Sequence, residues 1–128
     1  MTVSNLANPE LKRHTLTTHI RKNHIHINDS ELMERFTEKD KDAKLYSKFK
    51  NSEVAEEIIA QALIQNKNKI QKWDNSKINN SLIIKFKSNF IIGYGLNKNG
   101  NRFDLSYLTL ILAKNKSQGF RIQSAYPS

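Results

Sequence analysis

The hydrophobic residues follow one spacing in the first part of the chain and another in the last part. Up to about residue 75, apolar side chains recur three or four positions apart, which is the spacing of an amphipathic helix. From residue 81 onward, short runs rich in Ile, Leu, Phe and Tyr are separated by clusters of Asn, Gly, Lys and Ser, as in strands joined by turns. Helices followed by strands predict an α+β domain, in which N-terminal helices pack on a C-terminal antiparallel sheet.

The first helical region follows a polar segment. Residues 1–8 are expected to be a flexible lead-in, and Pro9 suits the first turn of a helix. Leu16 and Ile20 are four positions apart, so they would share one face of a short helix. His19 lies beside that apolar stripe, and a helix here would hold it at the edge of a core.

Two asparagines mark the starts of later helices. Asn28 can cap a helix, and Glu31, three positions later, completes a capping box. Asn51 precedes a second helical stretch, and Ile70 with Trp73 predicts a further short helix after it. The inward faces of the first two helices would carry Leu32, Met33 and Phe36, and Val54, Ile58, Ile59, Ala62 and Leu63.

Four runs have the composition of strands. They cover residues 81–88, 89–96, 105–114 and 119–126, and they predict three or four antiparallel strands. The alternating segment 23–27 is compatible with a short extended piece or a loop.

Composition changes this picture in three ways. A chain of 128 residues is expected to form one domain, spanning residues 1–128. The absence of cysteine excludes disulfides and thiolate metal sites, so the core alone must hold the fold. No apolar stretch is long enough to cross a bilayer, and the first residues lack the features of a secretory signal.

The net charge of +9 indicates an anionic partner, which could be nucleic acid, an acidic protein or a membrane surface. All four histidines lie in one stretch, residues 14–36, among several lysines and arginines. Histidine is the commonest general acid or base, and fixed positive charge suits chemistry on a phosphodiester. The competing interpretation is that these histidines are solvated surface residues of a polar segment.

A metal site is not expected. The histidines are spaced by five, five and two positions, and none of these spacings is the four-residue spacing of a helical ligand pair. The acids of residues 38–44 alternate with lysines, which predicts a solvated turn.

Five segments, in order along the chain, carry a resemblance to a known family. They are HTLTTHI at 14–20, LMERF at 32–36, SKFKNSEVAEEIIAQAL at 47–63, IQKW at 70–73 and FRIQSAYP at 120–127. Together they resemble the ribonuclease A-like C-terminal toxin domains of bacterial contact-dependent growth inhibition proteins. The resemblance implies a ribonuclease A-like fold, here without disulfides.

The resemblance also implies a set of catalytic residues, namely His19, Arg35, Ser124 and Tyr126. Ser124 stands where the family usually has threonine, which keeps the hydroxyl. The segment from His19 to Arg35 is longer than in the family pattern, as if residues 22–26 were inserted. An ungapped alignment would use His24 instead.

The ungapped alignment has a physical cost. It would put Arg21 where the first motif has a core leucine, and burying an unpaired arginine costs several kcal/mol. His19 is therefore preferred and His24 is kept as the alternative.

Family membership would make the chain a metal-independent, cofactor-free ribonuclease. It would cleave RNA, with tRNA as one candidate, by attack of the ribose 2′-hydroxyl. One histidine would act as base or acid, Arg35 would hold the phosphate, and Ser124 and Tyr126 would share one strand face. Lys22, Lys85 and Lys87 are candidate substrate-binding residues.

The same resemblance implies a partner and a place of action. The domain would be delivered into a target bacterium, act in its cytoplasm, and be monomeric apart from its complex with a cognate immunity protein. Two other functions stay open from the residues alone: a non-catalytic basic module that binds nucleic acid and, less favoured, a metal-dependent nuclease.

Overall fold

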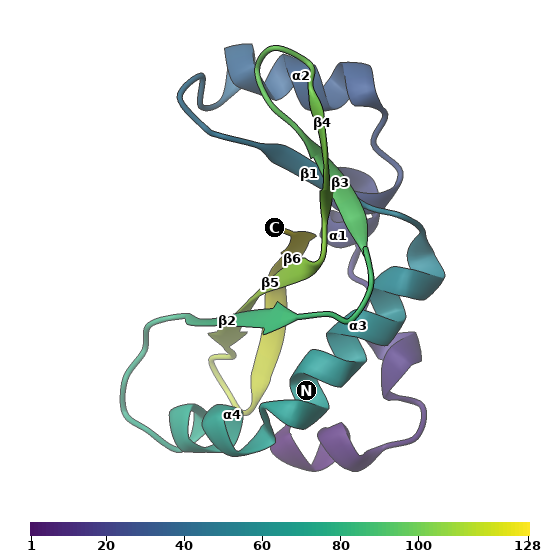
Figure 1. Cartoon of the computed structure of the whole chain (residues 1–128). Helices are drawn as coiled ribbons and strands as arrows, with labels where there is room; N and C mark the ends of the chain where they lie inside the picture. Colours follow the sequence, from purple (N-terminus) through teal and green to yellow (C-terminus); the bar gives the residue numbers. More distant parts are fainter.

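Helices and short helical turns form most of the first half of the chain, and strands form most of the second half (Figure 1). The computed structural model describes all residues, 1–128. The helical elements are η1 (Val3–Ala7), η2 (Leu11–His14), α1 (Thr18–Ile20), η3 (Arg21–Ile25), α2 (Asp29–Glu38), α3 (Ser52–Gln65) and α4 (Lys67–Asp74). The strands are β1 (Tyr46–Phe49), β2 (Leu82–Lys87), β3 (Gly93–Leu96), β4 (Arg102–Leu105), β5 (Tyr107–Lys114) and β6 (Phe120–Pro127). This is the predicted α+β class.

The strands form two antiparallel sheets of three, where the sequence predicted one sheet. Their orders are β1-β3-β4 and β2-β5-β6. The runs at 81–88, 105–114 and 119–126 became β2, β5 and β6. β1 and β4 were not predicted, because each has only four residues and polar side chains in place of an apolar run.

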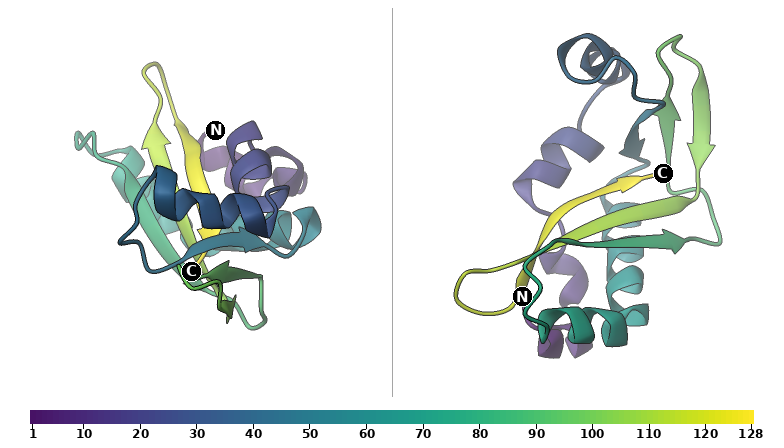
Figure 2. Two further views of the ribbon diagram at one scale, coloured as in Figure 1. Left: turned by 90° about the horizontal axis from the view of Figure 1, so that it is seen from above. Right: turned by 90° about the vertical axis from the view of Figure 1, so that its left-hand side faces the viewer.

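The two sheets belong to two lobes. The large lobe contains η1, η2, α1, α3, α4 and the β2-β5-β6 sheet, whereas the small lobe contains α2 and the β1-β3-β4 sheet (Figures 1 and 2). The main core is a cluster of 21 buried apolar residues, nearly all from the large lobe and joined by Phe49 of β1, in which α3 packs against β5. Asn51 caps α3 as predicted, since its side chain accepts a hydrogen bond from the Val54 backbone N–H.

The small lobe has a much smaller core. Its cluster consists of three buried residues, Ile27, Leu32 and Leu96. The predicted capping box at Asn28 and Glu31 is present and starts α2. With so little apolar area of its own, the small lobe depends on its junction with the large lobe.

That junction is built where β1 and β3 meet the end of β6. The buried hydroxyl of Ser47 donates a 2.6 Å hydrogen bond to the carbonyl of Pro127. Gly93 is required beside it, because a Cβ there would lie 2.1 Å from the Lys48 carbonyl oxygen and 2.7 Å from Pro127 Cγ. The two sheets are therefore held in close contact at the end of β6.

The N-terminal segment differs from the sequence prediction. Residues 1–8 were expected to be a flexible lead-in, but residues 3–7 form η1 and Leu6 is only 3% exposed. The Phe120 N–H also donates a 2.7 Å hydrogen bond to the Met1 carbonyl. Apolar burial against α3 and α4 explains the difference, and the scattered apolar residues Met1, Val3 and Leu6 gave no periodic signal from which to predict it.

Segment 23–27 is not extended, since most of it belongs to η3. No helix of the structure combines the length and the apolar character that a membrane span needs.

Candidate active site

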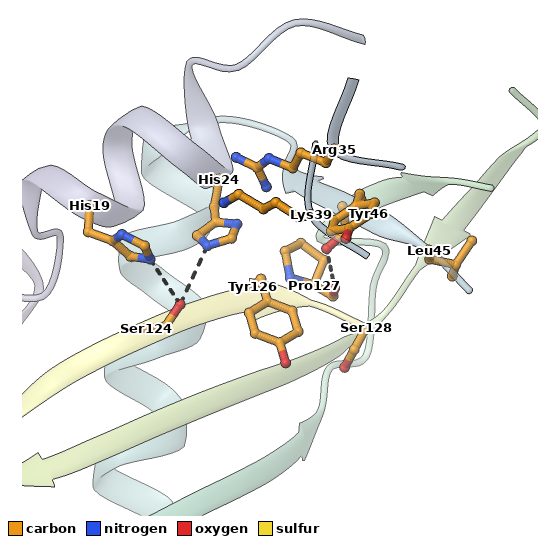
Figure 3. A pocket seen from close by; sticks show the side chains of 11 residues that line it. His19, His24, Arg35, Lys39, Leu45, Tyr46, Ser124, Tyr126, Pro127 and Ser128 are labelled. Atoms are coloured by element: carbon orange, nitrogen blue, oxygen red, sulfur yellow. Dashed lines mark hydrogen bonds between the residues drawn. The ribbon is translucent and has the colours of Figure 1, made fainter. Parts of the chain in front are cut away.

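A cavity of about 450 Å³ lies at the boundary between the lobes. This size is within the usual range of ligand-binding pockets. All five predicted catalytic residues line it (Figure 3). The full lining is His19, His24, Arg35, Lys39, Leu45, Tyr46, Ser47, Ser124, Tyr126, Pro127 and Ser128.

The two lobes contribute different chemistry to this cavity. β6 supplies Ser124 and Tyr126, which lie two positions apart and so share one face of the strand. From the small lobe, α2 and the residue after it supply Arg35 and Lys39, whose side chains reach toward His24 (Figure 3). The cations Arg35 and Lys39 thus come from the small lobe, whereas Ser124 and Tyr126 come from the large lobe.

The two histidines are brought together by an unusual helical turn. η3 is a π-helical turn, in which the His26 N–H donates to the carbonyl of Arg21, five residues back. Residues five apart therefore become neighbours, and the rings of His19 and His24 lie edge to face with centroids 5.4 Å apart. In the sequence analysis, His19 and His24 were alternative candidates for one catalytic position. The structure places both side chains in the cavity.

Both histidines approach the same hydroxyl. The Nε2 atoms of His19 and His24 are each 3.4 Å from the Oγ of Ser124 (Figure 3). Tyr126 lies beside His24, with ring centroids 5.6 Å apart. Two proton-carrying groups therefore face one point in the cavity.

His24 is held in the neutral form at neutral pH. Burial, followed by the positive charge of Arg35, lowers its pKa to about 4. His19 and Lys39 lower the pKa further, while the nearby backbone of Ser47 raises it. The Nδ1 atom is buried and meets no partner in good hydrogen-bond geometry.

Arg35 is a buried cation without an acidic partner. It is 8% exposed, and none of the three ion pairs of the chain includes it. Its Nη2 atom donates to the backbone carbonyl of Asn23 at 2.9 Å and to the side-chain oxygen of Asn23 at 3.3 Å. Burial lowers its pKa, but a guanidinium stays charged in proteins, so this site can accept an anion.

Asn23 connects the arginine to the first histidine. Its side-chain oxygen accepts from Arg35, so its amide nitrogen is the atom that lies 3.0 Å from His19 Nδ1. An amide nitrogen only donates, and His19 Nδ1 must therefore accept. The proton of the neutral His19 ring is then on Nε2, which faces Ser124.

The predicted substrate-binding lysines lie outside the cavity lining. Lys22 is exposed on η3. Lys85 and Lys87 are on β2, two strands away from Tyr126, and Lys85 donates to the hydroxyl of Thr109. Across the chain there is no group of three or more His, Cys, Asp or Glu side chains arranged to hold a metal ion.

Several residues of the site were not predicted. They are Asn23, Lys39, Tyr46 and Ser47. Lys39, Tyr46 and Ser47 meet the cavity only through tertiary contacts, and Asn23 joins Arg35, twelve positions away, to the nearby His19, so no local pattern marks this set. Ser128 could have been found, because it continues the alternation of Ser124 and Tyr126 along the same strand face.

Comparison with known proteins agrees with the resemblance drawn from the five segments. The solved structure described as "Crystal structure of CdiA-CT/CdiI complex from Y. kristensenii 33638" contains a similar chain, with a TM-score of 0.74 and 25% sequence identity. The match covers 88% of the present chain and 99% of that chain. No curated protein sequence matches. A family model described as "Bacterial CdiA-CT RNAse A domain" matches residues 14–127, so the chain belongs to this family of ribonuclease toxin domains of contact-dependent growth inhibition.

Proposed function

We propose that the chain is a metal-independent endoribonuclease that cleaves RNA through the ribose 2′-hydroxyl. One observation carries the proposal: two histidines face one hydroxyl of β6, beside a buried arginine that has no acidic partner. These are the parts that transphosphorylation needs, namely a base, an acid and a cation for the phosphate. Membership of a ribonuclease domain family supports the proposal.

His24 is the better candidate for the base. Its low pKa leaves it unprotonated at neutral pH, and its Nε2 faces the cavity beside Ser124 Oγ while Nδ1 is buried, so Nε2 is the atom placed to take the 2′-hydroxyl proton. A pKa near 4 alone makes a weak base. Phosphate bound at Arg35 would cancel one of the charges that lower this pKa, so substrate itself would strengthen the base.

Arg35 and Lys39 would stabilise the charge that gathers on the phosphate as the 2′-oxygen attacks. The bond from phosphorus to the 5′-oxygen then breaks, and that oxygen needs a proton. His19 presents an N–H at Nε2 to this region. When His19 takes up a second proton at Nδ1, the Asn23 amide must turn so that its oxygen accepts, and Asn23 thereby couples the acid to Arg35.

The products would carry 2′,3′-cyclic phosphate ends. The test is cleavage of an oligoribonucleotide in EDTA, compared with the same oligonucleotide bearing one 2′-deoxy residue at the cleaved position. We expect EDTA to have no effect and the deoxy residue to abolish cleavage there. Equal cleavage of the deoxy substrate would refute the mechanism, and RNA binding without any cleavage would favour a non-catalytic binding module.

The biological setting forms a second part of the proposal. The similar Y. kristensenii chain was solved as a CdiA-CT/CdiI complex, which supports a cognate immunity protein as partner of this domain. With a charge of +9 here, that partner should be acidic where it meets the domain. Delivered into a target bacterium, the domain would act on RNA in the cytoplasm, with tRNA a candidate target, and it would be monomeric when free.

A further inference from the structure

The strand face that carries Ser124 and Tyr126 continues across the β2-β5-β6 sheet. In the register of the sheet, Tyr126 pairs with Thr109 on β5, and Thr109 pairs with Lys85 on β2. Ser128 pairs with Tyr107 through two backbone hydrogen bonds in the next row. Residues opposite one another on antiparallel strands point to the same face, so this row lies directly beside the catalytic cavity.

A chain of hydrogen bonds crosses this row. Lys85 Nζ donates to Thr109 Oγ1 at 2.8 Å, and Thr109 Oγ1 donates to Ser128 Oγ at 2.9 Å. Thr109 is 2% exposed, whereas Lys85 is exposed and Ser128 is half-buried, so a buried hydroxyl holds two more accessible groups, Lys85 and Ser128, in place. A surface lysine that served only solubility would not need such a partner.

The donors left over define what could bind. Lys85 keeps two N–H groups and has no acceptor, and the Ser128 hydroxyl keeps its own hydrogen. Both groups therefore seek an acceptor oxygen. Tyr126 stands between them and the histidines, and aromatic side chains stack on nucleobases.

We infer that Lys85, Thr109 and Ser128 form a subsite for a nucleobase that carries a ring carbonyl, next to the phosphate held at Arg35. This inference rests on the proposed ribonuclease function. Lys85 and Ser128 donate to the carbonyl of uracil, cytosine or guanine, Tyr126 contacts the base, and Thr109 is a positioning residue that does not touch it. Adenine has no carbonyl and leaves both donors unpaired.

Binding of nucleoside 3′-monophosphates tests the subsite without requiring catalysis. Titration calorimetry of uridine and adenosine 3′-monophosphate should give the uridine compound about tenfold higher affinity, the size of one charge-assisted hydrogen bond. Lys85→Met and Thr109→Val should bring this ratio close to one. Thr109→Val keeps a β-branched side chain at a buried strand position, and circular dichroism verifies its fold.

Lys116→Met is the matched control, because Lys116 is an exposed lysine in the loop between β5 and β6. It removes the same charge and should leave the uridine-to-adenosine ratio unchanged. A ratio that survives Lys85→Met and Thr109→Val would overturn the subsite, because base size alone would then explain it. Equal binding of the two nucleotides by the unaltered protein would also overturn it. If RNA is not cleaved but the ratio behaves as expected, the subsite stands and the catalytic proposal fails.

Discussion

The two lobes differ sharply in how they are held together. The main cluster of 21 buried apolar residues lies almost entirely in the large lobe, with Phe49 of β1 reaching into it, whereas the cluster of the small lobe has three. The large lobe carries Ser124 and Tyr126, and the small lobe carries Arg35 and Lys39. The groups that would orient the reaction therefore lie on the strongly packed lobe, and those that would hold the anion lie on the weakly packed lobe.

This division has a physical reason. The positive charges of Arg35 and Lys39 lie close together in the empty site, and after burial they are among the causes that lower the pKa of His24 and keep it neutral. Placed in the large core, such a cluster would have to be desolvated at high cost. At the junction, the anionic substrate can offset that cost when it binds.

The largest expected effect is on the rate of RNA cleavage, and it comes from replacing His24, which lies between the lobes. His24→Gln should lower kcat/KM for RNA by a factor of about a hundred to ten thousand, since glutamine keeps the polarity but cannot take a proton at neutral pH. Single-turnover cleavage of a labelled oligoribonucleotide measures it. His26→Gln is the matched control, because His26 is exposed and does not line the cavity. A His24→Gln variant as active as the His26→Gln variant would remove His24 from the mechanism.

A second pair of variants separates the lobes by stability. Leu63→Ala, in the large core, should lower the global free energy of unfolding by about 2–5 kcal/mol. Leu32→Ala, in the small core, should mainly open the small lobe. Its effect would appear as faster hydrogen exchange of α2 and β3 amides while α3 amides stay protected.

This comparison can be contradicted directly. Both variants, Leu32→Ala and Leu63→Ala, could instead raise the hydrogen-exchange rates equally in the two lobes. The lobes would then unfold as one unit, and the difference in core size would not separate their stabilities.

The third effect is a dependence of stability on pH. The pKa of His24 is about 4 when folded and near 6.5 when unfolded, so between these values the unfolded chain binds the extra proton. The contribution of neutral His24 to the free energy of unfolding is fully present above pH 6.5. It is lost as the pH falls toward 4. It amounts to about 3 kcal/mol, from about 1.4 kcal/mol for each pKa unit.

Urea denaturation of the unaltered protein and of His24→Gln at several pH values measures this contribution. The difference between their unfolding free energies should shrink by this amount from pH 7 to pH 4. A constant difference would mean that His24 titrates normally in the folded protein.

The smallest effect concerns Lys22, which is exposed beside the cavity without lining it. Lys22→Met should leave the rate at saturating RNA unchanged. It should reduce the slope of log affinity against log salt by about 0.7, the value for one phosphate contact on a single strand. Fluorescence anisotropy with labelled RNA measures the slope, and an unchanged slope would show that Lys22 makes no phosphate contact.

The sequence predicted most strongly what local chemistry decides. Asn28 and Asn51 cap helices through contacts to residues three positions later, and the alternation along β6 put Ser124 and Tyr126 on one face. The contacts that it could not predict join residues far apart in the sequence. Arg35 and Asn23 are twelve positions apart, and the close contact of the β1-β3-β4 sheet with β6 depends on Gly93 and Ser47 beside Pro127.

The choice between His19 and His24 shows a different kind of limit. The argument against His24 was that its alignment would bury Arg21 at a core position, and it treated the two histidines as alternatives. A π-helical turn has more residues per turn than an α-helix, and no single residue type in the sequence predicts it. Both histidines line the cavity as a result.

The π-helical turn η3 also makes the geometry of the cavity sensitive to the number of residues in this segment. In an α-helix the side chain of residue i meets i+3 and i+4, but here His19 meets both Asn23 at i+4 and His24 at i+5. One extra residue in the backbone thus gives His19 a second partner without removing the first. Deleting Lys22 would restore the ordinary pitch and leave His19 with one of the two. Insertions and deletions of a single codon in this turn would therefore change the active site more than most substitutions around it.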